Sequence, residues 1–164
     1  MIKQMYRAIR QVFDRTLRPY LPPKQIRLGG VEAYRGSVLD RTLTDTPEYE
    51  QAARNELLNH VHDGDHVRIV GAGSGVTAVV AAQNGADSVT VIEVAERSVQ
   101  CARKTANLND FGDKISVKHG YVGEVQNPRM GAWGPQISPE QCRDCDVLEM
   151  DCEGAEMDIL TSFD

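Results

Sequence analysis

The chain has 164 residues, of which 41% are hydrophobic and 5% aromatic, and its 18 basic and 24 acidic side chains give a net charge of −6. This length suits one domain with a substantial hydrophobic core. The acidic balance argues against nonspecific nucleic-acid binding, so no nucleic-acid partner is expected. No apolar run approaches the roughly 20 residues that span a bilayer, and no secretory apolar region opens the chain. We therefore expect a cytoplasmic location.

The N-terminal residues 1–21 combine apolar and basic side chains at helical spacing. The apolar ones share one stripe of the predicted helix: Ile2, Met5, Ile9, Val12, Phe13 and Leu17. Through Gly30 there are seven basic residues and the single acid Asp14, a local charge of +6, which leaves −12 for the rest. Two interpretations stay open. The favoured one packs the stripe on the domain, and the other lays the helix on an anionic membrane surface.

Two short predicted elements follow. Residues 26–28 and 31–34 form a β-hairpin with glycines at its turn. Thr46-Pro47-Glu48 supplies a cap, a first-turn proline and an early acid, so a helix is predicted from there to about residue 61. We divide the chain accordingly into an N-terminal region, residues 1–45, and a Rossmann-like domain, residues 46–164.

A glycine-rich stretch is the main feature of that domain. Residues 67–70 alternate as a strand does, Gly71, Gly73 and Gly75 follow at spacing two, and an Ala/Val-rich helix comes next. This order opens a nucleotide-binding βαβ unit. The first two glycines permit a sharp turn and close approach of a ligand to the backbone. The third would let the helix pack close to the strand, and the N–H groups at the helix start would face the ligand.

The next strand, residues 88–93, ends in Glu93, which lies 18 residues after Gly75. A carboxylate at about this place accepts hydrogen bonds from a ribose. A nucleoside cofactor is therefore favoured over a plain α/β core whose glycines only turn the chain. A helix over about 95–108 and a strand over 115–119 follow, with Gly120 and Tyr121 just beyond.

The C-terminal part begins with a long loop. Residues 122–144 are rich in Gly, Pro and polar residues and contain the only tryptophan, Trp133. Such a loop is a functional lid or disordered. A strand over 146–151 then delivers Asp151 and Glu153, before a helix starting near Gly154. Ligands sit outside the carboxyl ends of parallel strands, so Asp151 should share a crevice with Gly73 and Glu93. The alternative role for these acids is helix capping.

The cysteines are a weak metal signal. They are Cys101, Cys142, Cys145 and Cys152. One Cys-x-x-Cys without a second pair or a nearby His-x-x-x-His favours ordinary thiols over a metal or redox site. We expect no bound metal.

The glycine spacing also resembles that of a known superfamily. A dinucleotide fingerprint would have its third glycine or alanine where Val76 stands, whereas Gly-x-Gly-x-Gly followed by an acid at the next strand end resembles the class I S-adenosylmethionine-dependent methyltransferases. Residues 146–156 resemble the Asp-x-Glu-Gly-Ala-Glu signature of the FkbM family, as do Tyr49-Glu50 and Asn107-Leu108-Asn109. The resemblance covers about residues 45–164. It implies an α/β fold, a Rossmann-like parallel sheet sandwiched by helices, and S-adenosylmethionine as cofactor.

The resemblance also implies roles for individual residues. The cofactor-binding set comprises Gly71, Ala72, Gly73, Ser74 and Gly75 at the methionine end, Glu93 with Val94 at the ribose, Gly120 and Tyr121 at the adenine, and Asp151 near the methyl group. Candidate catalytic bases are Asp151, Glu153 and His119. No Asn/Asp-Pro-Pro-Tyr motif is present, so the implied reaction is O-methylation of a hydroxyl on a sugar, glycan or small metabolite.

Two departures from the superfamily define the alternatives. Ile69 stands where many members carry an acid, and the chain ends after the fourth of seven expected strands. We therefore expect the C-terminal strands to be missing and the fourth strand to expose an edge capable of self-association. The alternatives are a catalytically degenerate cofactor-binding or interaction module and, disfavoured by Val76, a nucleotide-dependent oxidoreductase.

Overall fold

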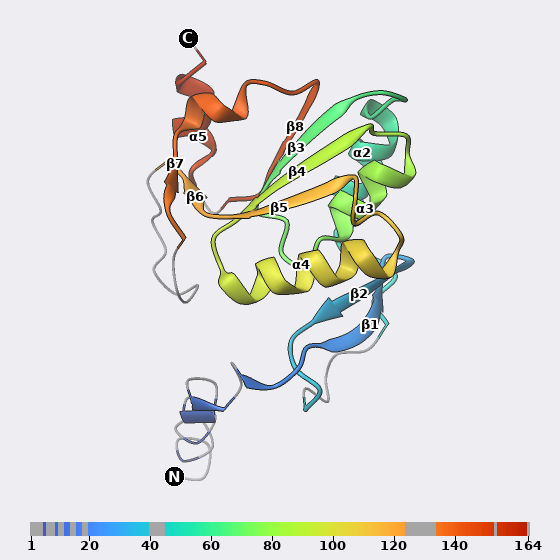
Figure 1. The fold of residues 1–164 in the computed structure, drawn as a ribbon, viewed down its shortest axis with the longest axis vertical. Helices are drawn as coiled ribbons and strands as arrows, with labels where there is room; N and C mark the ends of the chain where they lie inside the picture. Colours follow the sequence, from blue (N-terminus) through green and yellow to red (C-terminus); the bar gives the residue numbers. More distant parts are fainter. Residues whose placement is uncertain are drawn as a thin grey trace.

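The computed structural model describes residues 20–39, 45–123, 134–152 and 154–163, together with Met5, Ile9, Val12, Phe13, Thr16 and Leu17. Its centre is a parallel sheet in the order β5-β4-β3-β8 (Figure 1). The strands are β3 (His66–Val70), β4 (Ser88–Glu93), β5 (Ile115–His119) and β8 (Val147–Met150). The chain steps outward from β3 to β5 and then returns to the other side of β3. The strand order therefore reverses beside β3, at the point where α/β sheets open a crevice.

One face of the sheet carries the larger core. It is covered by α2 (Gln51–His60), α3 (Val76–Gln83) and α4 (Glu96–Leu108) (Figure 1). Helix α3 is buried along its length from Val76 to Ala82. This follows from its composition, because α3 is apolar all round and contacts the sheet and both neighbouring helices.

The predicted hairpin is present and belongs to the same core. Strands β1 (Lys24–Leu28) and β2 (Val31–Arg35) pair antiparallel around Gly29-Gly30. The hairpin packs on α4, where the Tyr34 amide donates to Thr105 Oγ1 at 2.9 Å. Its inward side chains join the buried cluster on this face of the sheet: Ile26, Leu28, Val31 and Ala33.

The other face carries a smaller cluster. It is covered by α5 (Glu156–Thr161), a 3-10 helix (Pro139–Cys142) and a pair of two-residue strands, β6 (Tyr121–Val122) and β7 (Gln136–Ile137). The buried side chains there are Val70, Ile92, Val122, Cys142 and Ile159. Helices thus cover both faces, which confirms the predicted α/β fold with a Rossmann-like parallel sheet. The β6–β7 pair was not predicted, because strands of two residues carry no periodic pattern.

The predicted helix start at Thr46 is wrong. Helix α2 begins at Gln51, and Thr46 instead pairs with the hairpin: its amide donates to Arg27 O at 3.1 Å, and its carbonyl accepts from the Gly29 amide at 2.9 Å. These bonds hold Thr46 in an extended bridge to Leu28, where it cannot cap a helix. The residue before the helix is Glu50, in the left-handed region at φ 47°. Residue Trp133 lies outside the described residues.

The favoured packing of the N-terminal stripe on the domain is also wrong for four of the five stripe positions that the structure describes, Phe13 being half-buried. Met5, Ile9, Val12 and Leu17 each keep about 60% of their surface exposed. Across the described ranges, no helix is both long enough and apolar enough to cross a membrane. The division into residues 1–45 and 46–164 stays a prediction.

Candidate functional site

A cavity of about 180 Å³ opens at the carboxyl ends of the parallel strands, beside the point where the strand order reverses. Its walls come from the turn after β3, the end of β4, the start of β6 and the turn after β8. The lining residues are Glu50, Val70, Gly71, Gly73, Ile92, Glu93, Val94, Ser98, Gly120, Tyr121, Val122, Asp151 and Cys152. Much of this wall is apolar, with polar groups contributed by the glycine turn and three acids.

The first glycine is required by the crossing of two backbones. Gly71 has φ +92°, and its amide donates to Ile92 O at 2.9 Å. A Cβ at this position would lie 2.0 Å from the carbonyl oxygen of Asp151. Gly71 therefore lets the turns after β3 and β8 touch, and this contact forms the floor of the cavity.

The third glycine serves helix packing, but against a partner other than the predicted one. Gly75 precedes α3 with φ +80°, and a Cβ there would lie 2.9 Å from the Cα of Ala102 in α4. It therefore permits close approach of α3 to α4 rather than of α3 to the strand.

The Glu93 side chain joins the two turns that flank the cavity. It is only 5% exposed. Its Oε2 accepts from the Gly73 amide and its Oε1 from the Ala95 amide, both at 2.9 Å. Each carboxylate oxygen has two lone pairs, so one on each oxygen remains for a hydroxyl donor entering the cavity.

The structure brings together most of the residues predicted to bind a cofactor. Those that line the cavity are Gly71, Gly73, Glu93, Val94, Gly120, Tyr121 and Asp151. Ala72, Ser74 and Gly75 do not line it, and the first two are nearly buried, at 3% and 5% exposed. Glu153 lies outside the described residues.

His119 is placed beside the cavity rather than in its wall. Its Nε2 lies 3.0 Å from the carbonyl oxygen of Val94. Because a carbonyl can only accept, this ring nitrogen carries the proton and donates it to the backbone. The bond ties the end of β5 to the turn after β4.

Sequence reasoning missed several lining residues. The sequence pointed to Glu50 only through its resemblance to a family, to Cys152 only as an ordinary thiol, and not at all to Ser98. Burial, followed by interaction with Glu156, raises the pKa of the Cys152 thiol to about 12, so it is not a thiolate nucleophile at neutral pH. In the part of the chain that the structure describes, no group of three or more His, Cys, Asp or Glu side chains is placed to hold a metal ion.

Behind the cavity wall lies a further acid, Glu149, close enough to Asp151 and Glu50 of the lining to interact with their charges. Glu149 in β8 pairs with Ile69 in β3. It therefore lies on the strand next to position 69, where many members of the superfamily carry an acid. Its Oε2 is buried and has no hydrogen-bond partner among the described residues. Burial, with smaller contributions from Asp151 and Glu50, raises the pKa of Glu149 to about 7. Burial likewise raises the pKa of Glu50.

This arrangement predicts a loss of stability as pH rises. The ordinary pKa of Glu149 is 4.5, so between about pH 4.5 and 7 the folded state binds more protons than the unfolded state. The free energy of unfolding should therefore fall across this window, by on the order of 2 kcal/mol, and level off above it. In Glu149→Gln the fall should be smaller, since only Glu50 still contributes. Urea unfolding at about pH 5 and pH 8 gives the free energy of unfolding of both proteins. An equal change in this free energy between the two pH values would contradict the assignment to Glu149.

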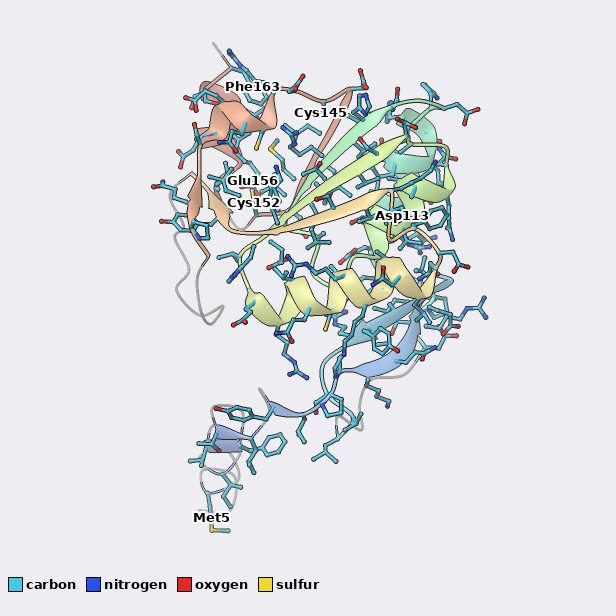
Figure 2. All side chains as sticks on the ribbon, in the orientation of Figure 1. Met5, Asp113, Cys145, Cys152, Glu156 and Phe163 are labelled. Atoms are coloured by element: carbon cyan, nitrogen blue, oxygen red, sulfur yellow. The ribbon has the colours of Figure 1, made fainter. Side chains whose placement is uncertain are left out.

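The turn after β8 is fixed by the last acid of the 146–156 stretch. The Glu156 carboxylate accepts from the Cys152 amide at 3.0 Å and from the Gly154 amide at 2.9 Å, and Figure 2 shows Glu156 beside Cys152. A hydrogen bond from its own backbone, followed by those from Cys152 and Gly154, lowers the pKa of Glu156. Its role in the structure is to shape the turn that carries Asp151.

Comparison with known proteins points to methyltransferases. The family described as ribosomal protein L11 methyltransferase (PrmA) matches residues 51–130. A ribosomal protein L11 methyltransferase from Exiguobacterium sp. is 39% identical over 64 residues, which are 39% of this chain and 20% of that protein. A probable protein arginine N-methyltransferase 6.1 from Oryza sativa subsp. indica is 34% identical over 91 residues, 54% of this chain and 22% of that protein. This chain thus spans about a fifth of the length of these relatives.

Among solved structures, the ribosomal protein L11 methylase from Lactobacillus delbrueckii subsp. bulgaricus aligns with a TM-score of 0.42 and 23% identity, covering 57% of this chain and 50% of that one. The sequence matches support a similarity to the class I S-adenosylmethionine-dependent methyltransferases. The family match ends at residue 130, before the 146–156 stretch on which the FkbM resemblance rests.

Proposed function

We propose that this chain binds S-adenosylmethionine in the cavity at the carboxyl ends of its strands and serves methyl transfer from it. The observation that carries the proposal is the pairing of Gly73 with Glu93, which presents an open glycine turn and a buried carboxylate to one cavity. The matched relatives, which are named as methyltransferases, support the same cofactor.

The proposed binding mode assigns each wall of the cavity to a part of the cofactor. The turn at Gly71 and Gly73 would receive the methionine end, because no side chain blocks its backbone. Glu93 would accept hydrogen bonds from the ribose hydroxyls through its remaining lone pairs. Gly120 and Tyr121 would border the adenine, next to the apolar side chains of the lining.

The reaction would be an in-line displacement. The bound sulfonium supplies an activated methyl group, which leaves sulfur as the acceptor's lone pair forms the new bond. Positioning and exclusion of water supply most of the rate in such a transfer. The protein's task is therefore to hold the acceptor opposite the carbon–sulfur bond and to receive any proton that the acceptor loses.

Asp151 is our candidate for the group that receives this proton. It lines the cavity and its side chain is exposed. His119 is less suited, because it is not part of the wall of the cavity. Glu153, two residues after Asp151 but outside the described residues, stays a candidate on sequence grounds alone.

For the acceptor we propose a hydroxyl of a sugar or small metabolite, on the FkbM resemblance of residues 146–156. A protein side chain is the second candidate, because the relatives are named as methyltransferases of ribosomal protein L11 and of protein arginine. Both candidates use the same cavity and cofactor.

Calorimetric titration of the 164-residue chain with S-adenosylmethionine and with NAD tests the cofactor. We expect micromolar binding of S-adenosylmethionine and none of NAD. Binding of NAD in its place would overturn the proposal. A folded chain that binds neither would favour the degenerate module.

Transfer of a labelled methyl group tests the acceptor. The chain is incubated with labelled S-adenosylmethionine and with hydroxylated sugars, an arginine-rich peptide or ribosomal protein L11. Label on the sugars alone supports the hydroxyl acceptor. Label on the peptide or on L11 replaces it with a protein acceptor and leaves the cofactor proposal standing.

A further inference from the structure

The N-terminal segment, residues 1–21, has a feature that the proposed catalytic function does not use. Four of its described apolar side chains are largely exposed: Met5 is 60% exposed, Ile9 60%, Val12 61% and Leu17 60%. Phe13 is half-buried. These four large apolar side chains are among the most exposed of their kind in the described part of the chain. Leaving them in water forgoes the free energy of burial, so a partner surface is expected.

The geometry of the described residues places this apolar set on one side of a helix. Met5, Ile9 and Val12 are helical and are separated by four and three residues, the spacing of one helix face. The Leu17 amide donates to Phe13 O at 3.0 Å, an i to i−4 bond that continues the helical pattern. Met5, Ile9 and Val12 therefore form a stripe, and Leu17 adds an exposed apolar side chain at the end of the helix.

The segment is attached to the domain at its C-terminal end. Arg97 in α4 donates through Nη2 to the carbonyl oxygen of Leu21 at 3.1 Å, and the Val38 amide donates to Pro22 O at 3.1 Å. Met5 lies at the far end of the molecule from Phe163 (Figure 2). These bonds hold the chain at residues 21 and 22, whereas the described side chains of Met5, Ile9, Val12 and Leu17 are exposed.

Charge indicates which partner suits the stripe. Residues 1–30 carry a net charge of +6, whereas the rest of the chain carries −12. An anionic lipid surface would attract residues 1–30 and repel the rest of the chain. These opposite forces would orient the molecule with the stripe toward the lipid and the domain away from it. An apolar stripe flanked by basic side chains is the composition of helices that lie in the membrane interface.

A second copy of the chain is a poorer partner, because outside the segment no described element exposes more than two large apolar side chains. Apart from the segment, the large apolar side chains exposed there come from separate elements: Val38 and Leu39 after the hairpin, Leu58 in α2, and Met157 and Leu160 in α5. We propose that the N-terminal segment docks this protein on an anionic membrane surface. The exposed side chains of Met5, Ile9, Val12 and Leu17 would enter the lipid interface, and the net charge of +6 on residues 1–30 would attract the segment to the headgroups. This proposal does not depend on the catalytic one.

Flotation of the full chain with lipid vesicles tests the docking. Vesicles of phosphatidylcholine alone are compared with vesicles that also contain phosphatidylglycerol. We expect binding to the anionic vesicles only, and its release at about 1 M salt, where the Debye length falls to about 3 Å.

Two matched pairs of variants separate charge from burial. Arg10→Glu should weaken binding to the anionic vesicles at least fivefold. Lys118→Glu makes the same charge change at an exposed position in β5, and it should leave this binding within twofold of the native value. Ile9→Asp should weaken it about tenfold, whereas Leu58→Asp, at a side chain already 52% exposed in α2, should not. Thermal unfolding of each variant checks that the domain stays folded.

Three outcomes would overturn the proposal: equal binding to neutral vesicles, no binding to either kind, or equal losses in both members of a pair. Light scattering of the chain without lipid identifies the competing partner, because a dimer abolished by Ile9→Asp would assign the stripe to a second copy. Titration with S-adenosylmethionine should be unchanged in all four variants. Failure of docking is therefore distinguishable from failure of the proposed function.

Discussion

Gly71→Ala should destabilise the protein by about 3 kcal/mol or more. The residue has φ +92°, which costs a non-glycine residue about 1–2 kcal/mol. In addition, the new Cβ would lie 2.0 Å from the carbonyl oxygen of Asp151, and two backbone turns would have to separate. Overpacking of this kind typically adds about 1–3 kcal/mol. The floor of the cavity should be displaced as well, so affinity for S-adenosylmethionine should fall.

Gly64→Ala is the matched control. Gly64 has the same φ of +92°, but a Cβ there would have nothing within 4 Å. It should therefore show the backbone strain alone, about 1–2 kcal/mol. Urea unfolding of both variants measures the difference, which is the cost of the contact between the two turns. Equal destabilisation by the two substitutions would mean that the turns separate freely.

Glu93→Gln should lower the affinity for S-adenosylmethionine at least tenfold. The native side chain accepts one backbone hydrogen bond on each oxygen. The glutamine side chain has a single acceptor oxygen, which can accept from only one of the Gly73 and Ala95 amides in this geometry. Its NH₂ group would face the other amide, and two donors would then oppose each other. An unpaired buried donor costs about 1–3 kcal/mol, and we expect a loss of stability of about 2 kcal/mol. The ribose would also lose one of its two proposed acceptors.

Glu96→Gln, the same change at an exposed position in the first turn of α4, is the control and should change stability by less than about 0.5 kcal/mol. Calorimetry on folded protein gives the dissociation constants, and urea unfolding gives the stabilities. If Glu93→Gln loses stability but binds S-adenosylmethionine as tightly as the native chain, then Glu93 only braces the turns and the ribose assignment fails.

The strands, most helices and the position of the cavity could be predicted from sequence because their signals are local. Alternating β-branched residues define β4 and β5, and the spaced glycines mark the turn after β3. The rule that ligands meet the carboxyl ends of parallel strands then placed Glu93 and Asp151 at one edge of the sheet.

What could not be predicted depends on contacts between distant segments. Glu50 and Glu149 approach each other only because β8 pairs with β3 and α2 begins beside that pair. Thr46 has every local mark of a helix cap, but the hairpin uses its backbone. The exposure of the N-terminal stripe likewise depends on whether the domain has a surface on which it can pack. The helical periodicity of the apolar residues does not indicate whether such a surface exists.

The two hydrogen bonds of Glu93 also bear on how a ligand would enter. One carboxylate holds the turn after β3 through the Gly73 amide and the turn after β4 through the Ala95 amide. These bonds form within the protein itself, so both walls are set before a ligand arrives. A preorganised cavity spares the ordering of loops that otherwise opposes association, and a larger share of each new contact then remains as binding free energy. The positions of the two turns that flank the cavity are thus fixed when the protein folds, and a ligand would not have to order them.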